Sequence, residues 1–222
     1  MNDLIALVPM RHHSQRVPGK NYRLLGGKPL YYHILTTLLD VPELDGIVVD
    51  TDSPEIKAGL EREFPSIQVI DRPEALRADE ISMNEILTYD MSQVKAELYL
   101  QTHSTNPLLR GETVSAAIQA FRDGQGRYDS LFSVTRLQTR LYDREGRAIN
   151  HNPGELIQTQ DLPPVFDENS CIYLFTEASL MKNDHRIGSS PLMFEIDPGE
   201  AWDIDTPLDF EIVDFLIGKD AE

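Results

Sequence analysis

The stretch that decides the fold is an apolar run leading into a cationic loop: Leu4-Ile5-Ala6-Leu7-Val8, then Pro9-Met10-Arg11-His12-His13-Ser14-Gln15-Arg16-Val17-Pro18-Gly19-Lys20-Asn21. The apolar run predicts a short buried strand, and the proline and glycine residues that follow predict a loop. Apolar side chains then recur at helical spacing between Leu30 and Leu39, with Pro29 suited to the first turn. We therefore expect strand, loop and helix in succession, which is how a parallel α/β sheet begins.

The same stretch has an unusual charge. Residues 4–39 hold five of the twenty Lys and Arg residues and no Asp or Glu, although the chain has a formal net charge of −17. Gly19 lets the backbone approach a ligand closely, and the next helix turns its positive end toward the loop. A solvated loop with ion pairs elsewhere is the alternative, but the lack of local carboxylates favours a site for a small anion.

The rest of the chain continues the alternation of strand and helix. A capping residue at Asp52 or Ser53 and a capping box from Ser82 to Glu85 predict two helix starts, and Gly124 marks the end of another helix. We expect the remaining strands at residues 44–50, 67–70, 97–101, 129–135, 171–176 and 192–196, and a last helix from Thr206. This order predicts a three-layer, Rossmann-like α/β fold with a mostly parallel sheet.

One segment breaks this rhythm. Residues 136–168 are polar and rich in glycine and proline, and we interpret them as an insertion with at most a hairpin at residues 144–147. The 222 residues, 41% of them hydrophobic, suffice for one core, so we expect a single domain over residues 1–222.

A pair of acids near the end of the chain predicts a divalent metal site. In Ala201-Trp202-Asp203-Ile204-Asp205-Thr206, the two Asp side chains point to the same face if the backbone is extended. Mg²⁺ usually takes one or two carboxylates and completes its shell with water and substrate phosphates. From local sequence alone, helix capping ahead of Thr206 explains the two acids equally well. Asp209 is better explained as a capping partner.

Composition narrows the class of protein. The acidic chain lacks the broad basic surface that nucleic acids and anionic membranes require, so we expect neither partner. A single cysteine, Cys171, fits a reducing compartment, and the first residues lack the basic start of a signal peptide. We therefore expect a cytoplasmic protein.

Several motifs together resemble the acylneuraminate cytidylyltransferases, which join CTP to a sialic-type (nonulosonic) acid and release pyrophosphate. The opening loop matches the family pattern through Arg11, Ser14, Arg16, Val17, Pro18, Lys20 and Asn21. Further matches are Arg72-Pro73-Glu74-Ala75-Leu76, Ser82-Met83-Asn84-Glu85, residues 101–110, Glu168-Asn169 before Ile172-Tyr173, Arg186-Ile187-Gly188, and Asp203-Ile204-Asp205. The matches are spread over most of the chain, which makes the set more specific than any one motif.

The resemblance implies a nucleotidyltransferase fold and roles for particular residues. Nucleotide binding is implied for Arg11, Ser14, Gln15, Arg16, Lys20, Asn21, Ser82 and Asn84, and catalytic roles for Arg11, Arg16, Lys20 and Asp205. Contact with the sugar acid is implied for Gln101, Asn169 and Tyr173, and Mg²⁺ or another divalent cation at Asp203 and Asp205. The family also implies a homodimer, with residues 136–168 as a candidate contact.

The match departs from the family pattern at one position that bears on the substrate. The sialic-acid enzymes have an Arg where this chain has Asp167, and that Arg would pair with the sugar carboxylate. Recognition of the carboxylate must therefore come from elsewhere, with Arg136 and Arg140 as candidates, or the acceptor differs. The alternatives are a 3-deoxy-octulosonate cytidylyltransferase and a non-catalytic nucleotide-binding homologue.

Overall fold

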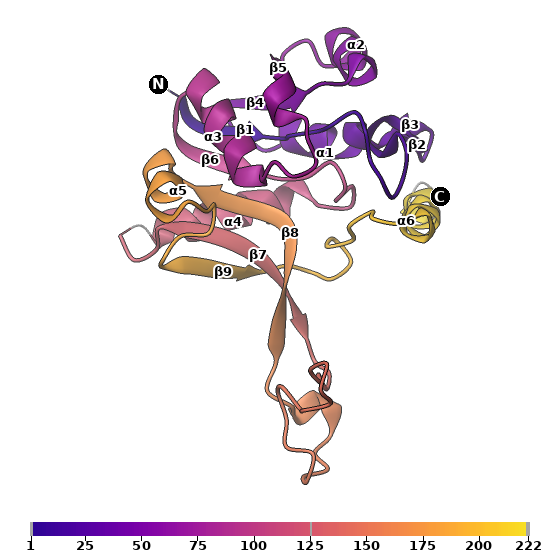
Figure 1. The fold of residues 1–222 in the computed structure, drawn as a ribbon, viewed down its shortest axis with the longest axis vertical. Helices are drawn as coiled ribbons and strands as arrows, with labels where there is room; N and C mark the ends of the chain where they lie inside the picture. The colour runs from indigo at the N-terminus through magenta and orange to yellow at the C-terminus, as the bar shows by residue number, and fades with distance from the viewer. Residues whose placement is uncertain (1, 125, 221–222) are drawn as a thin grey trace.

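A single mixed sheet forms the centre of the computed structural model, which describes residues 2–124 and 126–220 (Figure 1). Its seven strands follow the order β5-β4-β1-β6-β8-β7-β9. Strand β8 is antiparallel to both neighbours, and the other adjacent pairs are parallel. The strands span Asn2–Leu7 (β1), Gly46–Thr51 (β4), Gln68–Asp71 (β5), Ala96–Gln101 (β6), Ser130–Leu137 (β7), Val165–Phe175 (β8) and Pro191–Glu195 (β9). The mostly parallel α/β sheet is confirmed.

Helices cover both faces of this sheet, as the sequence predicts. On one face lie Leu30–Leu39 (α1), Pro54–Glu63 (α2) and Gly111–Asp123 (α4); on the other lie Met83–Gln93 (α3) and Glu177–Asn183 (α5). Alternation along β1 explains this arrangement, since Leu4 and Ala6 enter the first core whereas Ile5 and Leu7 enter the second. The result is three layers.

Local capping positions the helices. Ser53 accepts a hydrogen bond from the backbone N–H of Ile56 at 3.3 Å, and Ser82 and Glu85 form the expected capping box. Thr176 caps α5, a helix that the sequence analysis did not predict. Three short 3₁₀ turns occur at Lys20–Tyr22 (η1), Glu74–Leu76 (η2) and Thr159–Asp161 (η3).

The last helix, Pro207–Asp220 (α6), packs against a segment near the start of the chain. It packs beside a small hairpin of Leu24–Leu25 (β2) and Lys28–Pro29 (β3). A separate buried cluster forms there from Val17, Leu25, Leu30, Ile204, Phe210 and Val213. Because this cluster includes neighbours of both the loop cations and the paired acids, apolar burial brings those two groups together.

Between β7 and β8 the chain leaves the body. Figure 1 shows residues 138–164, here called the arm, projecting away from the sheet. The strands continue into the expected insertion at both ends, since Arg136 pairs with Phe166 and Leu137 with Val165. A bridge between Tyr142 and Ala148 closes a hairpin within the arm. Within the described residues, no helix has the length and apolar composition needed to cross a membrane.

A buried charged trio links β4, the segment after β5, and α3. The Nε of Arg72 donates to Asp50, and both residues are almost fully buried, as is Asp90. Among the described residues, Oδ2 of Asp50 and both carboxylate oxygens of Asp90 have no hydrogen-bond partner. Burial, reinforced by the Asp50 charge, raises the pKa of Asp90 to about 9. A proton held on Asp90 reduces the negative charge beside the single guanidinium of Arg72.

We predict that Asp90→Asn stabilises the protein more at pH 8 than at pH 4. Folded Asp90 binds its proton more tightly than unfolded Asp90, so stability falls as pH rises from the ordinary Asp pKa toward about 9. An amide cannot ionise and removes this loss. Each kcal/mol of this loss that the amide removes should raise the midpoint of thermal unfolding at pH 8 by about 2–4 °C. The exposed control Asp123→Asn should show no such pH dependence; equal behaviour of the two variants contradicts the proton held on Asp90.

Candidate functional site

The loop cations and the C-terminal acids meet directly. Lys20 Nζ lies 2.6 Å from the carbonyl oxygen of Ile204 and 3.2 Å from Oδ1 of Asp205. Arg16 Nη2 donates to the same Oδ1 at 2.7 Å. The Lys20 side chain is 12% exposed and that of Arg16 is 66% exposed, so solvent screens the Lys20 contact far less. Two segments at opposite ends of the chain thus form one charged site.

Asn21 connects the cationic loop to the segment that follows β6. Its Nδ2 donates to the carbonyl oxygen of Arg11 at 2.8 Å, and its Oδ1 accepts from Ser104 Oγ at 2.8 Å. Gly19, two residues before Asn21, has a φ of 66°, which is a left-handed conformation suited to glycine. The loop is therefore held in a defined shape beside the carboxyl ends of β1 and β6, where ligands of α/β sheets bind.

A cavity of about 280 Å³ opens beside this loop. Its lining includes Arg11, Asn21, Arg72, Arg77 and His103. Asp79 lies at its rim, where it accepts hydrogen bonds from Arg11 and Gln15. The loop cations are therefore paired with carboxylates from distant segments. A larger cavity of about 670 Å³, between α1 and the start of α4, contains none of the predicted site residues.

The acid pair has the properties of a site for a hard cation. Oδ1 of the half-buried Asp203 has no hydrogen-bond partner among the described residues. Burial raises the pKa of Asp203, and the charge of Asp205 adds to the rise. A divalent cation would compensate both effects, and carboxylate oxygens are the donors that Mg²⁺ prefers.

Asp203 and Asp205 would supply two protein ligands for such a cation. The described residues contain no cluster of three or more His, Cys, Asp or Glu side chains that would hold a metal. This number suits Mg²⁺, which takes its remaining ligands from water and substrate phosphates. Asp209 does not join the pair, because it accepts hydrogen bonds from the backbone N–H groups of Asp205 and Thr206 at the start of α6.

Gln101, at the end of β6, belongs to a second polar group. Its Oε1 accepts from Arg186 Nη1 at 2.6 Å, and its Nε2 lies 3.0 Å from His103 Nε2. The guanidinium of Arg186 lies over the ring of Tyr173, 3.6 Å from the centroid. Burial, followed by the charges of Arg186 and Lys20, lowers the pKa of His103 to about 3. His103 is therefore neutral near pH 7.

The other predicted site residues have local roles in this structure. Ser14 accepts from the backbone N–H of Val17 at 3.4 Å, and exposed Ser82 caps α3. Asn84 contacts the segment before β9 through the carbonyl oxygen of Asp184 and the N–H of Arg186. Asn169 is buried and its Oδ1 accepts from Ser133 Oγ at 2.6 Å.

Three residues of the site were not singled out from the sequence: Asp79, His103 and Arg186. Arg186 was quoted within a family-like motif but given no role. Its neighbours in space come from β6 and β8, so no sequence spacing connects them. Asp79 lies in an irregular segment whose position depends on the tertiary fold.

A family model matches most of the chain. The model of the family described as "Cytidylyltransferase" matches residues 5–206, which include the cationic loop and both acids. The chain belongs to the cytidylyltransferase family. It is therefore a nucleotidyltransferase.

Curated relatives of this cytidylyltransferase match it over nearly its whole length. The CMP-N,N'-diacetyllegionaminic acid synthase of Legionella pneumophila is 27% identical, with 99% of this chain and 98% of the relative covered. The post-translational flagellin modification protein B of Campylobacter coli is 24% identical, with 98% and 96% covered.

Solved structures agree on the fold. A CMP:2-keto-3-deoxy-manno-octonic acid synthetase complexed with CTP superimposes with a TM-score of 0.72 at 18% identity, covering 99% of this chain and 100% of that one. The 4-diphosphocytidyl-2C-methyl-D-erythritol synthase of Anaerococcus prevotii gives a TM-score of 0.70 at 13% identity, covering 98% and 96%. These similarities confirm the nucleotidyltransferase fold.

We predict that Asp205→Ala leaves the fold intact and lowers turnover of CTP at least ~100-fold, on the scale of losing one preorganised electrostatic group. Asp205 is the carboxylate shared by Arg16 and Lys20 and the partner of Asp203. Pyrophosphate release gives the rate, and circular dichroism checks the fold. Asp123→Ala, at an exposed carboxylate on α4, is the matched control and should behave as wild type. Near-wild-type turnover of Asp205→Ala would refute the assigned role.

Proposed function

We propose that this protein transfers CMP from CTP to the anomeric hydroxyl of a nonulosonic, sialic-type acid and releases pyrophosphate. The observation that carries the proposal is the contact of Lys20 and Arg16 with Asp205, beside Asp203, whose Oδ1 has no hydrogen-bond partner among the described residues. Cations and metal-ligand oxygens on two sides of one space are what a polyphosphate with a bound divalent ion requires.

In this reaction the C2 hydroxyl oxygen forms a bond to the α-phosphorus of CTP. The bond from that phosphorus to the bridging oxygen of pyrophosphate breaks, and the hydroxyl proton is released. Catalysis of this kind depends on positioning and charge stabilisation.

Each part of the site has a role in that scheme. Arg11, Arg16 and Lys20 would bind the triphosphate, Asn21 would hold the loop in shape, and Gln101 would face the acceptor. Asp203 and Asp205 would hold Mg²⁺, which supplies further charge neutralisation to the phosphates. Arg11 and Arg16 are ion-paired with Asp79 and Asp205 in this structure. When the nucleotide binds, its phosphates would replace these carboxylates as the anionic partners of the two arginines.

The proposed acceptor class rests on the relatives. The Legionella pneumophila protein is named a synthase of CMP-N,N'-diacetyllegionaminic acid, and another relative, from Danio rerio, an N-acylneuraminate cytidylyltransferase. A third relative, from Hydrogenovibrio crunogenus, is a 3-deoxy-manno-octulosonate cytidylyltransferase, 24% identical over 78% of this chain. The test must therefore include both eight-carbon and nine-carbon keto-deoxy acids.

A pyrophosphate-release screen with CTP, Mg²⁺ and a panel of eight- and nine-carbon keto-deoxy acids tests the proposal. We expect release with at least one nine-carbon acid, and loss of release when EDTA removes the metal. The matched control replaces CTP with ATP. A protein that binds CTP but releases no pyrophosphate with any acid would be a non-catalytic homologue, and preference for an eight-carbon acid would move it to the octulosonate branch.

We also propose that the protein is a homodimer whose contact includes the arm. The arm carries exposed apolar side chains, with Leu156 99% and Ile149 60% exposed, on a segment that projects from the body (Figure 1). Exposed apolar surface of this kind is typical of protein contacts.

Light scattering tests this assembly. We predict the mass of two chains for the wild type, and a shift toward one chain for the double variant Leu156→Ser and Ile149→Ser, since polar side chains weaken an apolar contact. The control Met181→Ser changes an exposed apolar residue on α5, away from the arm, and should leave the mass unchanged. A monomeric wild type rejects the proposal.

A further inference from the structure

We propose that Arg186 binds the carboxylate of the acceptor acid and so replaces the arginine that the family pattern has at the position of Asp167. This inference rests on the proposed function, because it concerns the second substrate of that reaction. It assigns a specificity-determining role to a residue of the segment before β9, whose family-like motif Arg186-Ile187-Gly188 carries no role from the sequence alone.

The first observation is that Arg186 is a half-buried cation with no direct ion pair among the described residues. Among the described residues, no carboxylate lies within 4.0 Å of its guanidinium, whereas the buried Arg72 pairs with Asp50. Its side-chain contacts are neutral: the ring of Tyr173 and Oε1 of Gln101. Burying a charge without a counter-charge is unfavourable, so an arginine in this setting is suited to an anionic ligand.

The second observation is that Arg186 is held in place from several directions. Its backbone N–H donates to Asn84 Oδ1 at 3.3 Å, while Asn84 Nδ2 donates to the carbonyl oxygen of Asp184 at 3.1 Å. The guanidinium is fixed by stacking at 3.6 Å and by a hydrogen bond of 2.6 Å. A planar donor fixed in this way loses little entropy when it binds a carboxylate through two hydrogen bonds.

The third observation is that Gln101 and His103 connect this arginine to the cavity beside the cationic loop. Gln101 connects it to His103, which lines the 280 Å³ cavity with Arg11 and Asn21. Gln101 is the last residue of β6 and pairs with Tyr173 of β8. On its other side it pairs with Leu7, the last residue of β1, so the cationic loop begins at the same end of the sheet. An acceptor whose carboxylate rests on Arg186 therefore lies beside the site for CTP.

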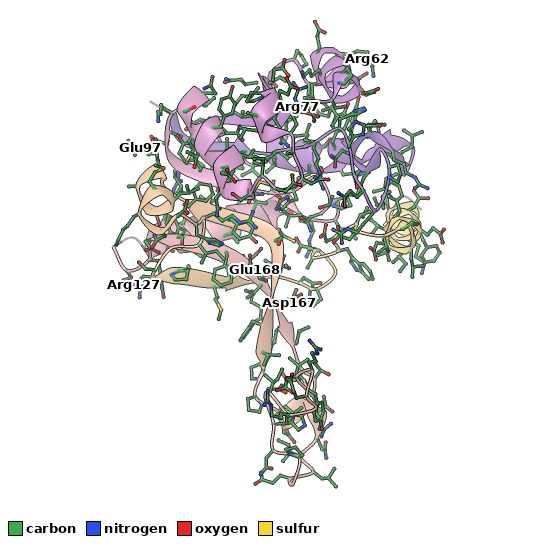
Figure 2. The ribbon with its side chains drawn as sticks, viewed as in Figure 1. Arg62, Arg77, Glu97, Arg127, Asp167 and Glu168 are labelled. Carbon is green, nitrogen blue, oxygen red and sulfur yellow. The ribbon has the colours of Figure 1, made fainter. Side chains whose placement is uncertain are left out.

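The nearby acids do not take this role from the ligand. The hydroxyl of Tyr173 donates a hydrogen bond to Glu168, and among the described residues this carboxylate forms no ion pair with Arg186. Asp167 pairs with Thr135 in the ladder between β7 and β8, and Figure 2 shows Asp167 and Glu168 where the arm joins the body. Position 167 repels a carboxylate, whereas Arg186 attracts it.

Arg186→Gln tests the proposal, with Arg186→Lys as the conservative variant. The matched control is Arg127→Gln, since Arg127 also lies near a tyrosine ring, that of Tyr128 at 5.5 Å, but is exposed outside the site. For Arg186→Gln we expect the KM for the acid to rise about 10- to 100-fold, the scale of a lost charge-assisted hydrogen bond, with the KM for CTP unchanged. Arg186→Lys should recover part of the loss, and Arg127→Gln should match wild type.

A neutral analogue separates recognition from structural support. The wild type should prefer the free acid over its methyl ester, and Arg186→Gln should lose that preference. Equal loss toward acid and ester, or a change confined to CTP, shows that Arg186 only supports the fold and overturns the inference.

Calorimetric binding of the acid to the CTP-loaded protein keeps the two proposals distinguishable. Acid binding that survives Arg186→Gln unchanged overturns the role of Arg186 whatever the turnover. A wild type that binds the acid through Arg186 but releases no pyrophosphate overturns the proposed reaction instead. A wild type that binds no acid of the panel overturns both.

Discussion

Lys20 and Asp205 are separated by 185 positions in the sequence, yet their side chains meet at 3.2 Å. The rest of the site depends on this contact, because it joins the cationic loop after β1 to the acids before α6. The charges alone do not create it. The cluster that contains Val17 and Ile204 supplies apolar burial next to each charged partner. A chain with a formal net charge of −17 thereby keeps a compact positive site at one edge of its sheet.

Much of the fold follows from the sequence, because strands and helices alternate with clear apolar periodicity. The capping box at Ser82 and the cap at Ser53 are local signals, and the structure contains both. The reversal of β8 is different in kind. Its direction depends on how the chain returns from the arm, and a strand buried on both faces has the same apolar pattern in either direction. Helix α5 is short, so it gives little periodicity to detect.

The residues of the candidate site also fall into those that the sequence predicts and those that only the structure brings together. The cationic loop and the acid pair are visible in sequence, because charge and spacing mark them before the fold is known. The structure shows their contact. The partners that cross between elements are not visible: Asp79 reaches Arg11 from an irregular segment, and Arg186 reaches Gln101 from beyond α5. An isolated arginine in a loop usually belongs to a solvated surface, and only burial over Tyr173 distinguishes this one.

The most direct measurement of the central claim is a crystal structure of the protein with CTP and Mg²⁺. We expect the triphosphate within hydrogen-bond distance of Lys20 and Arg11, with the metal ion between the phosphates and the carboxylates of Asp203 and Asp205. Triphosphate density in the larger cavity between α1 and α4, or a metal ion bound away from both acids, would contradict it.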